Sequence, residues 1–169
     1  MKKIRSKSKK GFTLVELIVV LVILAILAAM LVPALTGYIQ RARQEKDFQA
    51  ASTVLTAVQS MATQAYATAA TVNAPTAAEY QKVITLSDIE DLAGVANIHS
   101  LTGEAVDGIV TQLVVQFEDG GAYYAYKYGC TSWGSDTTSS ANALAAVANP
   151  TTVTGTPVAF TAPESAATT

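Results

Sequence analysis

The chain has 169 residues, of which half are hydrophobic and 14% are charged. Six of its eleven Lys and Arg residues lie among the first ten positions, with no acidic residue beside them; the remainder holds five basic and thirteen acidic residues, a side-chain balance of −8. This acidity disfavours nucleic-acid binding through a basic face, except locally around Arg41 and Arg43. Cys130 is the only cysteine, which excludes an intrachain disulfide and predicts a free or buried thiol.

The basic head is followed at once by a hydrophobic stretch. Residues 12–35 contain a single charge, Glu16, and a helix of that length covers about 36 Å, enough to cross a bilayer. A basic block beside such a segment is more often a topology determinant than a nucleic-acid arm, so we expect a cytoplasmic N-terminus and an external C-terminal part. A carboxylate at bilayer depth costs roughly 2.5 to 3.5 kcal/mol, so Glu16 needs a partner or an interfacial position.

Two ordinary interpretations compete for this stretch. A secretory signal peptide would be cleaved near Ala28 and Ala29, but Glu16 interrupts its hydrophobic region, the apolar run continues to Leu35, and the residues that follow have a helical pattern. A plain single-pass anchor accommodates the length but gives the carboxylate no role.

The residues around the start of the stretch carry a family resemblance. The sequence Lys9-Lys10-Gly11-Phe12-Thr13-Leu14-Val15-Glu16, followed by the apolar run and Pro33, resembles the N-terminal processing and methylation signal of type IV pilins. The pseudopilins of type II secretion and competence systems share this signal. The likeness is close over residues 9–35 and looser over the helix beyond.

The resemblance implies that a membrane-embedded prepilin peptidase cuts after Gly11 and that Phe12 is N-methylated. It also implies that the Glu16 carboxylate faces the Phe12 amine of a neighbouring subunit and so sets the register of assembly. From the residues themselves, Gly suits a cleavage boundary because it lacks a Cβ and lets the backbone lie extended in a protease groove.

Pro33 interrupts the helix pattern, because it has no amide hydrogen and its ring crowds the carbonyl of Ala29. A tolerated kink near a membrane interface is one interpretation. The resemblance implies another, in which the helix melts locally when the subunit moves from bilayer to filament, aided by the low helix propensity of Gly37.

The sequence predicts three regions: a basic leader (1–11), one long helix (12–72) and a globular region (73–169). The helix has a transmembrane or filament-core half (12–35) and an amphipathic half (36–72), and it is expected to end near Thr71. The amphipathic half has an apolar stripe at helical spacing that needs a sheet to cover. The stripe consists of Phe48, Ala51, Val54 or Leu55, Val58, Met61 or Ala62, and Ala65 or Tyr66. No heptad persists along it, which disfavours a coiled coil.

The globular region is expected to contain a hairpin at 109–128. Strand 109–117 should place Ile109, Thr111, Leu113, Val115 and Phe117 on one face, and the turn 118–121, which includes Gly120 and Gly121, should lead to a second strand, 122–128. The hairpin is expected to pack on the helix stripe.

Shorter elements flank this hairpin. Before it, Ser87-Asp88-Ile89-Glu90 predicts a capping box that starts a short helix, which Gly94 closes. After it, a Thr/Ala-rich C-terminal segment is expected to hold a short helix near 142–148 and a strand near 158–160. The fold class is therefore α+β, a type IV pilin-like arrangement of a long N-terminal helix on a small antiparallel sheet.

Catalytic chemistry has little support. His99 is the only histidine, and there is neither a Cys/His spacing for a metal nor a phosphate-binding loop. Asp88, Glu90 and Asp91 could gather a cation, although a solvated acidic helix start is the simpler interpretation. We therefore expect no enzyme activity, no metal and no cofactor. The four tyrosines between residues 123 and 128 suggest an adhesive or electron-carrying surface, but packing within a small sheet is the more common use of such rings.

The resemblance implies a major or minor pilin that assembles into a homo-oligomeric surface filament for adhesion, motility or DNA uptake. Its partners would be the peptidase, an assembly ATPase and a platform protein. The precursor would lie in the cytoplasmic membrane and the mature subunit in an extracellular pilus. Many pilins staple the C-terminal region with a disulfide, so the lone Cys130 is closer to pilins of Gram-positive bacteria. A secretion or competence pseudopilin is the alternative, and a membrane-anchored extracellular binding module is the alternative from another class.

Overall fold

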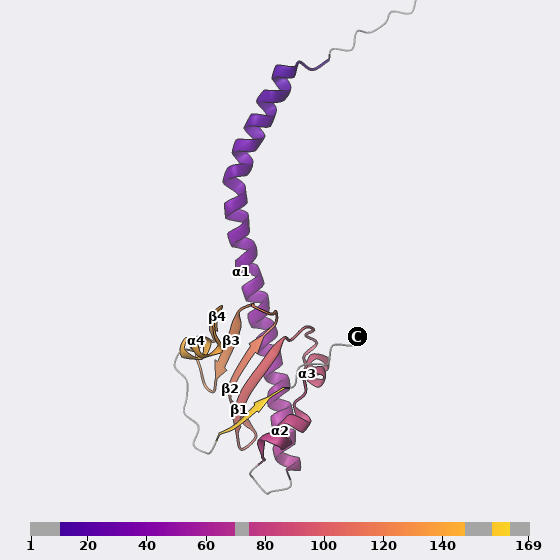
Figure 1. The fold of residues 1–169 in the computed structure, drawn as a ribbon, viewed down its shortest axis with the longest axis vertical. Helices are drawn as coiled ribbons and strands as arrows, with labels where there is room; N and C mark the ends of the chain where they lie inside the picture. Colours follow the sequence, from indigo (N-terminus) through magenta and orange to yellow (C-terminus); the bar gives the residue numbers. More distant parts are fainter. Residues whose placement is uncertain (1–10, 70–74, 148–156, 163–169) are drawn as a thin grey trace, which may run out of the picture. The chain divides into compact units, whose positions relative to one another are not determined.

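The computed structural model describes residues 11–69, 75–147 and 157–162. Contacts divide the chain into two compact units, Met1–Gln44 and Glu45–Thr169. One long helix, α1 (Leu14–Thr68), belongs to both, and a five-stranded antiparallel sheet of order β4-β3-β2-β1-β5 lies in the second (Figure 1). The α+β class with a long N-terminal helix and a small antiparallel sheet is therefore confirmed. The sequence-based division at residues 11, 35 and 72 stays a prediction.

Within the described residues of the first unit, no side chain packs against α1. Residues 11–36 are all exposed, and its most apolar 18-residue window has a mean hydropathy of 3.2 with none of it buried. Within the described residues α1 is the one helix long and apolar enough to cross a membrane. Large side chains such as Leu21 and Ile23 keep more than half of their surface exposed, so this stretch needs lipid or other protein around it.

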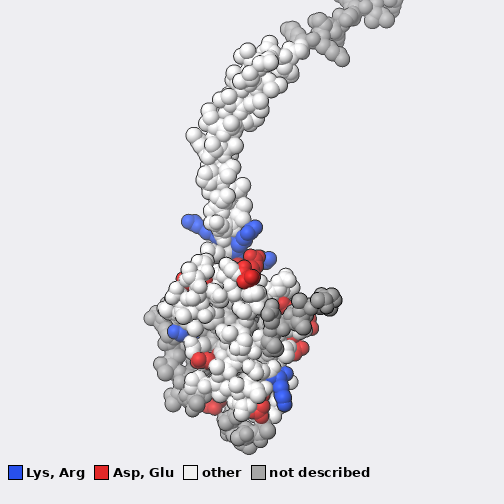
Figure 2. All heavy atoms as spheres, in the orientation of Figure 1, with Lys and Arg blue, Asp and Glu red and all other residues white. Residues whose placement is uncertain are grey.

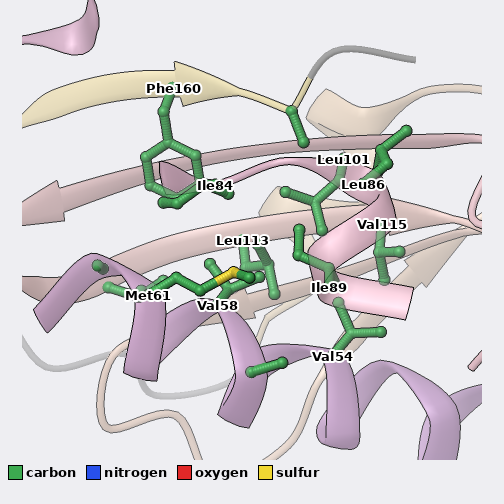
Figure 3. Packing of buried hydrophobic residues seen from close by; sticks show 14 of the residues in the cluster. Val54, Val58, Met61, Ile84, Leu86, Ile89, Leu101, Leu113, Val115 and Phe160 are labelled. Carbon is green, nitrogen blue, oxygen red and sulfur yellow. The ribbon is translucent and has the colours of Figure 1, made fainter. Parts of the chain in front are cut away.

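In the second unit, α1 buries one face against the sheet. Val54, Val58 and Met61 point from the helix toward Leu113 and Val115 of strand β2 (Ile109–Gln116), as Figure 3 shows. The predicted stripe is confirmed, with Ala51, Ala57, Ala62 and Ala65 also buried. These alanines let the helix backbone approach the sheet closely, while each fully buried Val or Leu contributes about 1.5 to 3 kcal/mol.

Two short helices complete this layer of the core, where the sequence predicted one. Helix α2 (Ala77–Val83) buries Tyr80, and α3 (Leu86–Ala93) buries Leu86 and Ile89. Helix α2 starts with a full capping box between Thr76 and Glu79, a Thr-x-x-Glu pattern that the sequence analysis overlooked.

The capping box predicted at Ser87 is wrong. The N-cap of α3 is Thr85, two residues earlier, whose hydroxyl accepts from the Asp88 amide at 3.2 Å. Glu90 instead accepts from the Ile98 amide at 2.9 Å and so ties the helix to the chain that follows it. Gly94 closes α3 as predicted, with φ of 63° in the left-handed region that favours glycine.

Strand β1 (Ser100–Val106) was not predicted from the sequence. It pairs with β2 through a two-residue turn, Asp107-Gly108, whose φ angles are 51° and 78°. Positive φ at both central positions gives the turn a twist that matches the strands, and Asp-Gly is a strong sequence signal for it. The signal was present, but the run of β1 itself contains Gly103 and Glu104, which are poor strand formers.

A bulge in β2 overturns the predicted faces of this strand. Glu104 pairs with Gln112 and Ala105 pairs with Val110, which leaves Thr111 as the extra residue. Because the bulge shifts the alternation by one position, Val110 joins Leu113 and Val115 in the core while Ile109 is 39% exposed. The prediction that Ile109 and Thr111 share one face with Leu113 is therefore wrong.

The side chain of Gln59 clamps α1 to the β1–β2 turn. Its Nε2 donates to the Gly108 carbonyl oxygen at 2.8 Å, and its Oε1 accepts from the Val110 amide at 2.9 Å. Both bonds join residues that are about fifty positions apart in the chain, so they fix the hairpin against one particular turn of the helix.

Replacing Gln59 by Met should destabilise the second unit by about 2 kcal/mol. The Val110 amide loses its acceptor, and the Gly108 carbonyl oxygen keeps the longer bond from the Thr63 hydroxyl at 3.4 Å. Urea unfolding of the detergent-solubilised chain, followed by the fluorescence of the single tryptophan Trp133, measures this. The matched control is Gln64→Met, since Gln64 is exposed on the same helix. Equal stability of the two variants would contradict the clamp.

The strand that returns after β2 is present as β3 (Tyr123–Lys127), which pairs with β2 from Gln112↔Lys127 to Gln116↔Tyr123. On its other side lies β4 (Gly134–Asp136), which was not predicted. The predicted C-terminal strand is β5 (Val158–Thr161), paired with β1.

Helix α4 (Ser140–Ala145) covers the face of the sheet that α1 leaves open. It begins two residues before the predicted segment, behind an N-cap at Ser139. Its Ala143, with Val147, packs on Val114 and Ala125 from β2 and β3, beside the partly buried free thiol of Cys130. Figure 1 shows α4 next to β3 and β4 and away from α2 and α3.

The tyrosines of β3 serve mainly in packing. Tyr124 is 2% exposed, its ring lies 4.9 Å from that of Phe48 and 6.0 Å from that of Phe117, and its hydroxyl donates to Asp47 Oδ2 at 2.9 Å. Tyr126 lies 5.5 Å from Trp133, measured between ring centroids. Burial raises the pKa of the Tyr124 hydroxyl well above its ordinary value of 10, and the carboxylates of Asp47 and Glu118 raise it further.

Replacing Tyr124 by Phe should cost about 1 kcal/mol near neutral pH, because it removes the bond to Asp47 but keeps the ring. The raised pKa means that the unfolded chain ionises first, so stability is full below pH 10 and falls as the pH rises above it. Wild type should lose up to about 1.4 kcal/mol per pH unit there through this group, and the variant should lose less.

Urea unfolding of both proteins between pH 8 and pH 11.5 checks this, with Tyr128→Phe as control because Tyr128 is 38% exposed. The pKa of Tyr80 and that of Tyr126 are also raised by burial, so a smaller slope should remain in the variant. Identical alkaline slopes in wild type and Tyr124→Phe would refute the assignment.

Candidate processing and assembly site

The first turn of α1 is organised by a reciprocal pair of side chains. The Thr13 amide and the Thr13 hydroxyl both donate to Glu16 Oε2 at 2.9 Å, and the Glu16 amide donates to Thr13 Oγ1 at 3.3 Å. This is a capping box, in which each side chain satisfies an amide that the helix start leaves free. This capping box was not predicted from the sequence, although the Thr-x-x-Glu spacing is its usual signal.

The capping box gives Glu16 a role inside its own chain. Both bonds from Thr13 converge on Oε2, and in the described part of the chain Oε1 accepts no hydrogen bond. Apolar side chains surround this carboxylate, and they are all exposed: Phe12, Val15, Leu17, Val19 and Val20. The carboxylate is thus half satisfied locally and sits on an uncovered apolar surface.

No contact within the described residues explains why position 11 is a glycine. A Cβ built at this position would meet nothing within 4 Å, and its φ is not in the left-handed region. Phe12 is 90% exposed. Within the described residues, nothing in the chain itself requires a glycine at position 11 or an aromatic ring at position 12. Residues 1–10, the rest of the predicted leader, lie outside the described residues.

The start of the chain matches a known family motif. Residues 6–32 match the family described as the prokaryotic N-terminal methylation motif. The chain carries the N-terminal methylation motif. The resemblance drawn from residues 9–35 is thereby confirmed, since this motif is the leader of type IV pilins and pseudopilins. Comparisons with curated proteins and with solved structures found no match.

The methylation motif covers Gly11, Phe12 and Glu16 and indicates a structural subunit rather than an enzyme. Together with the long apolar helix that starts inside it, the motif indicates a membrane-anchored precursor. The individual roles of Gly11, Phe12 and Glu16 in cleavage, methylation and assembly stay predictions.

Pro33 lies one residue beyond the matched motif, inside α1. The helix is continuous through it (Figure 1), and the Thr36 hydroxyl donates to the Pro33 carbonyl oxygen at 2.9 Å. The ring leaves the Ala29 carbonyl without its usual amide donor. A Cβ at Gly37 would meet nothing within 4 Å, so this glycine is not required by packing. Local melting at Pro33 and Gly37 stays a prediction.

Of the three acidic residues considered as a cation site, Asp88 and Glu90 have hydrogen-bond partners in the second unit, and Asp91 is exposed. Asp88 Oδ2 accepts from the Thr85 hydroxyl at 2.6 Å, and Glu90 holds the Ile98 amide. His99 Nε2 lies 3.6 Å from Asp119 Oδ1 at the surface. Across residues 11–69, 75–147 and 157–162, no group of three His, Cys, Asp or Glu residues is placed to hold a metal ion.

Proposed function

We propose that this protein is a prepilin, cleaved after Gly11 and polymerised through the apolar half of α1 into a type IV pilus. The observation that carries the proposal is the methylation motif at the head of a helix whose residues 11–36 are all exposed. The second half of this helix belongs to a folded unit with its own core. A secreted soluble domain has no use for such a stretch, whereas a subunit that passes from lipid into a helical bundle needs it.

The energetics support polymerisation once the subunit leaves the membrane. Residues 17–32 are uninterrupted apolar positions, and each large side chain among them contributes about 1.5 to 3 kcal/mol when neighbouring helices cover it instead of water. This sum exceeds the cost of ordering the subunit in a filament. An assembly ATPase and a platform protein in the membrane would supply the extraction step.

Cleavage also creates a positive charge that can pair with the Glu16 carboxylate. Cutting after Gly11 removes all six positive charges of the leader and creates a new amine on Phe12. The free oxygen of Glu16 then has a cationic partner available on the next subunit, where methylation keeps the amine basic. An amine and a carboxylate in apolar surroundings favour each other strongly, so the pair would set the stagger between neighbouring subunits.

Replacing Gly11 by Leu should leave the full-length precursor in the membrane, because the added side chain obstructs the extended backbone in the protease groove. Intact mass of the membrane-extracted protein measures this: wild type should begin at N-methylated Phe12 and the variant at Met1. Gly37→Leu is the matched control, since Gly37 also faces open space, and it should be processed normally. Normal maturation of Gly11→Leu would contradict the proposal that the peptidase requires glycine at position 11.

Electron microscopy of sheared surface fibres, labelled for this chain, then tests the filament itself. Long fibres that contain the chain support a pilus subunit in adhesion, motility or DNA uptake. A processed chain confined to the cell envelope would point to a secretion or competence pseudopilin. A chain that keeps its leader and stays monomeric would overturn the proposal in favour of a membrane-anchored binding module.

A further inference from the structure

Charge is divided sharply between the two units. Residues 45–169 hold three lysines and twelve acidic residues, a formal balance of −9, whereas the basic residues of 12–44 are Arg41 and Arg43, against Glu16 alone. Figure 2 shows basic side chains gathered in one band where the apolar stretch of α1 ends, with acidic side chains close beside them. Acidic side chains are scattered over the visible face of the second unit.

Within the described residues, neither of the two arginines forms an ion pair. Both are exposed, and the one ion pair within the described residues joins His99 and Asp119 instead. Beside them lie three large exposed apolar side chains of the same helix segment. We call this surface the basic collar, defined by Leu35, Tyr38, Ile39, Arg41 and Arg43.

We propose that the basic collar of one subunit docks on the acidic unit, residues 45–169, of a second copy of this chain. The inference rests on the proposed filament and names the surface that joins neighbouring subunits outside the apolar bundle. Charge complementarity carries it. When apolar helices bundle together, they bring several copies of residues 45–169 side by side. Each copy carries a formal charge of −9, so the copies repel one another. In the mature chain the collar holds the two arginines, the basic residues that lie outside these acidic units.

The collar also suits this partner in shape and chemistry. Tyr38 is 73% exposed and Ile39 is 42% exposed, so the surface offers apolar area beside its charges, as the centre of a protein interface does. Guanidinium groups bind carboxylates with two hydrogen bonds and are more weakly hydrated than ammonium groups. A surface of exposed carboxylates on the neighbour is therefore the matching surface.

The first test removes the two charges. In the double variant Arg41→Gln/Arg43→Gln, the subunit concentration needed to sustain filaments should rise about fivefold. Raising NaCl from 0.05 to 0.5 M, roughly the range over which ions screen exposed charges, should weaken wild-type filaments but should not weaken those of the variant, in which the repulsion between acidic units remains to be screened. Arg41→Lys/Arg43→Lys should retain most of the wild-type salt dependence. Lys82→Gln is the control, because Lys82 is an exposed cation of the acidic unit itself.

The second test locates the contact. A photoreactive phenylalanine at Gln40, which lies one helical turn before Arg43, is activated in filaments mixed from isotopically light and heavy subunits. Cross-linked peptides that join residue 40 of one isotope to residues 45–169 of the other support the proposal. Cross-links found solely within residues 12–44 overturn it.

The outcomes separate this inference from the proposed function. Filaments of the double glutamine variant with wild-type concentration and salt dependence reject the collar but leave the pilus assignment standing. A double variant that is lost from the membrane fraction before assembly shows that the arginines serve anionic lipid headgroups, which also rejects the collar. Absence of filaments from wild type, with Phe12 processed normally, rejects the proposed function itself.

Discussion

Replacing Glu16 by Ala should leave cleavage after Gly11 intact and should abolish filament assembly. The peptidase acts before the carboxylate is needed, whereas the Phe12 amine of the next subunit would be buried without a counter-charge. An uncompensated buried charge costs roughly 3 to 5 kcal/mol, which corresponds to at least about a hundredfold rise in the subunit concentration that assembly requires. Fibre yield per cell, with intact mass confirming maturation, measures both parts.

The capping box at Thr13 makes a sharper comparison available. Gln at position 16 keeps a side-chain oxygen that can accept from the Thr13 amide but carries no charge. If Glu16 acts through the neighbouring amine, Glu16→Gln should assemble as poorly as Glu16→Ala. If capping alone matters, Glu16→Gln should assemble normally.

Thr13→Val supplies the complementary control. It removes the hydroxyl that bonds to Glu16 but leaves the charge, and loss of such a cap costs about 1 kcal/mol of helix stability. This variant should lower fibre yield modestly. Wild-type fibre yield from Glu16→Gln would show that the charge has no assembly role.

Replacing Gly134 by Val should detach α4 from the sheet. A Cβ at this position would lie inside the van der Waals contact of the Ala143 carbonyl oxygen and 2.9 Å from the Val147 amide nitrogen. These are backbone atoms, which cannot rotate away as a side chain can, so we expect a loss of about 3 kcal/mol. For a chain of this size that lowers the melting temperature by roughly 10 °C.

Two probes lie beside this contact. Trp133 precedes Gly134 and packs on Tyr126, so its fluorescence should follow unfolding, and Cys130 lies against the α4 cluster, so alkylation of its thiol should become faster. Ser135→Ala is the control, because Ser135 is exposed. Unchanged melting and unchanged alkylation of Gly134→Val would show that α4 does not pack as described.

Local patterns in the sequence determined much of this protein. The methylation motif is contiguous in the sequence, from the basic head through Gly11 and Phe12 to Glu16, and the run behind it is apolar at every position from 17 to 32. Both can therefore be recognised without any long-range contact. The stripe from Ala51 to Ala65 was readable for the same reason, since side chains three and four residues apart share a helix face.

What sequence reasoning missed depends on contacts between distant residues. Strand β1 contains Gly103, where a Cβ would meet the ring of Phe160 at 2.5 Å and the Gln112 carbonyl oxygen at 2.9 Å. The glycine is required by residues far along the chain and looks like a strand breaker when seen alone. Strand β4 is likewise a short polar segment, Gly-Ser-Asp, that becomes a strand through pairing with β3.

The bulge at Thr111 has the same origin. Alternation along 109–117 placed Ile109 in the core, but the tight Asp107-Gly108 turn and the pairing of Ala105 with Val110 shift the register by one residue. The sequence by itself therefore determined the helix, its motif and its apolar faces, which follow from neighbouring residues. The tertiary structure alone decided which strand residues face α1 and where the sheet gains its outer strands, because pairing between distant segments selects the register.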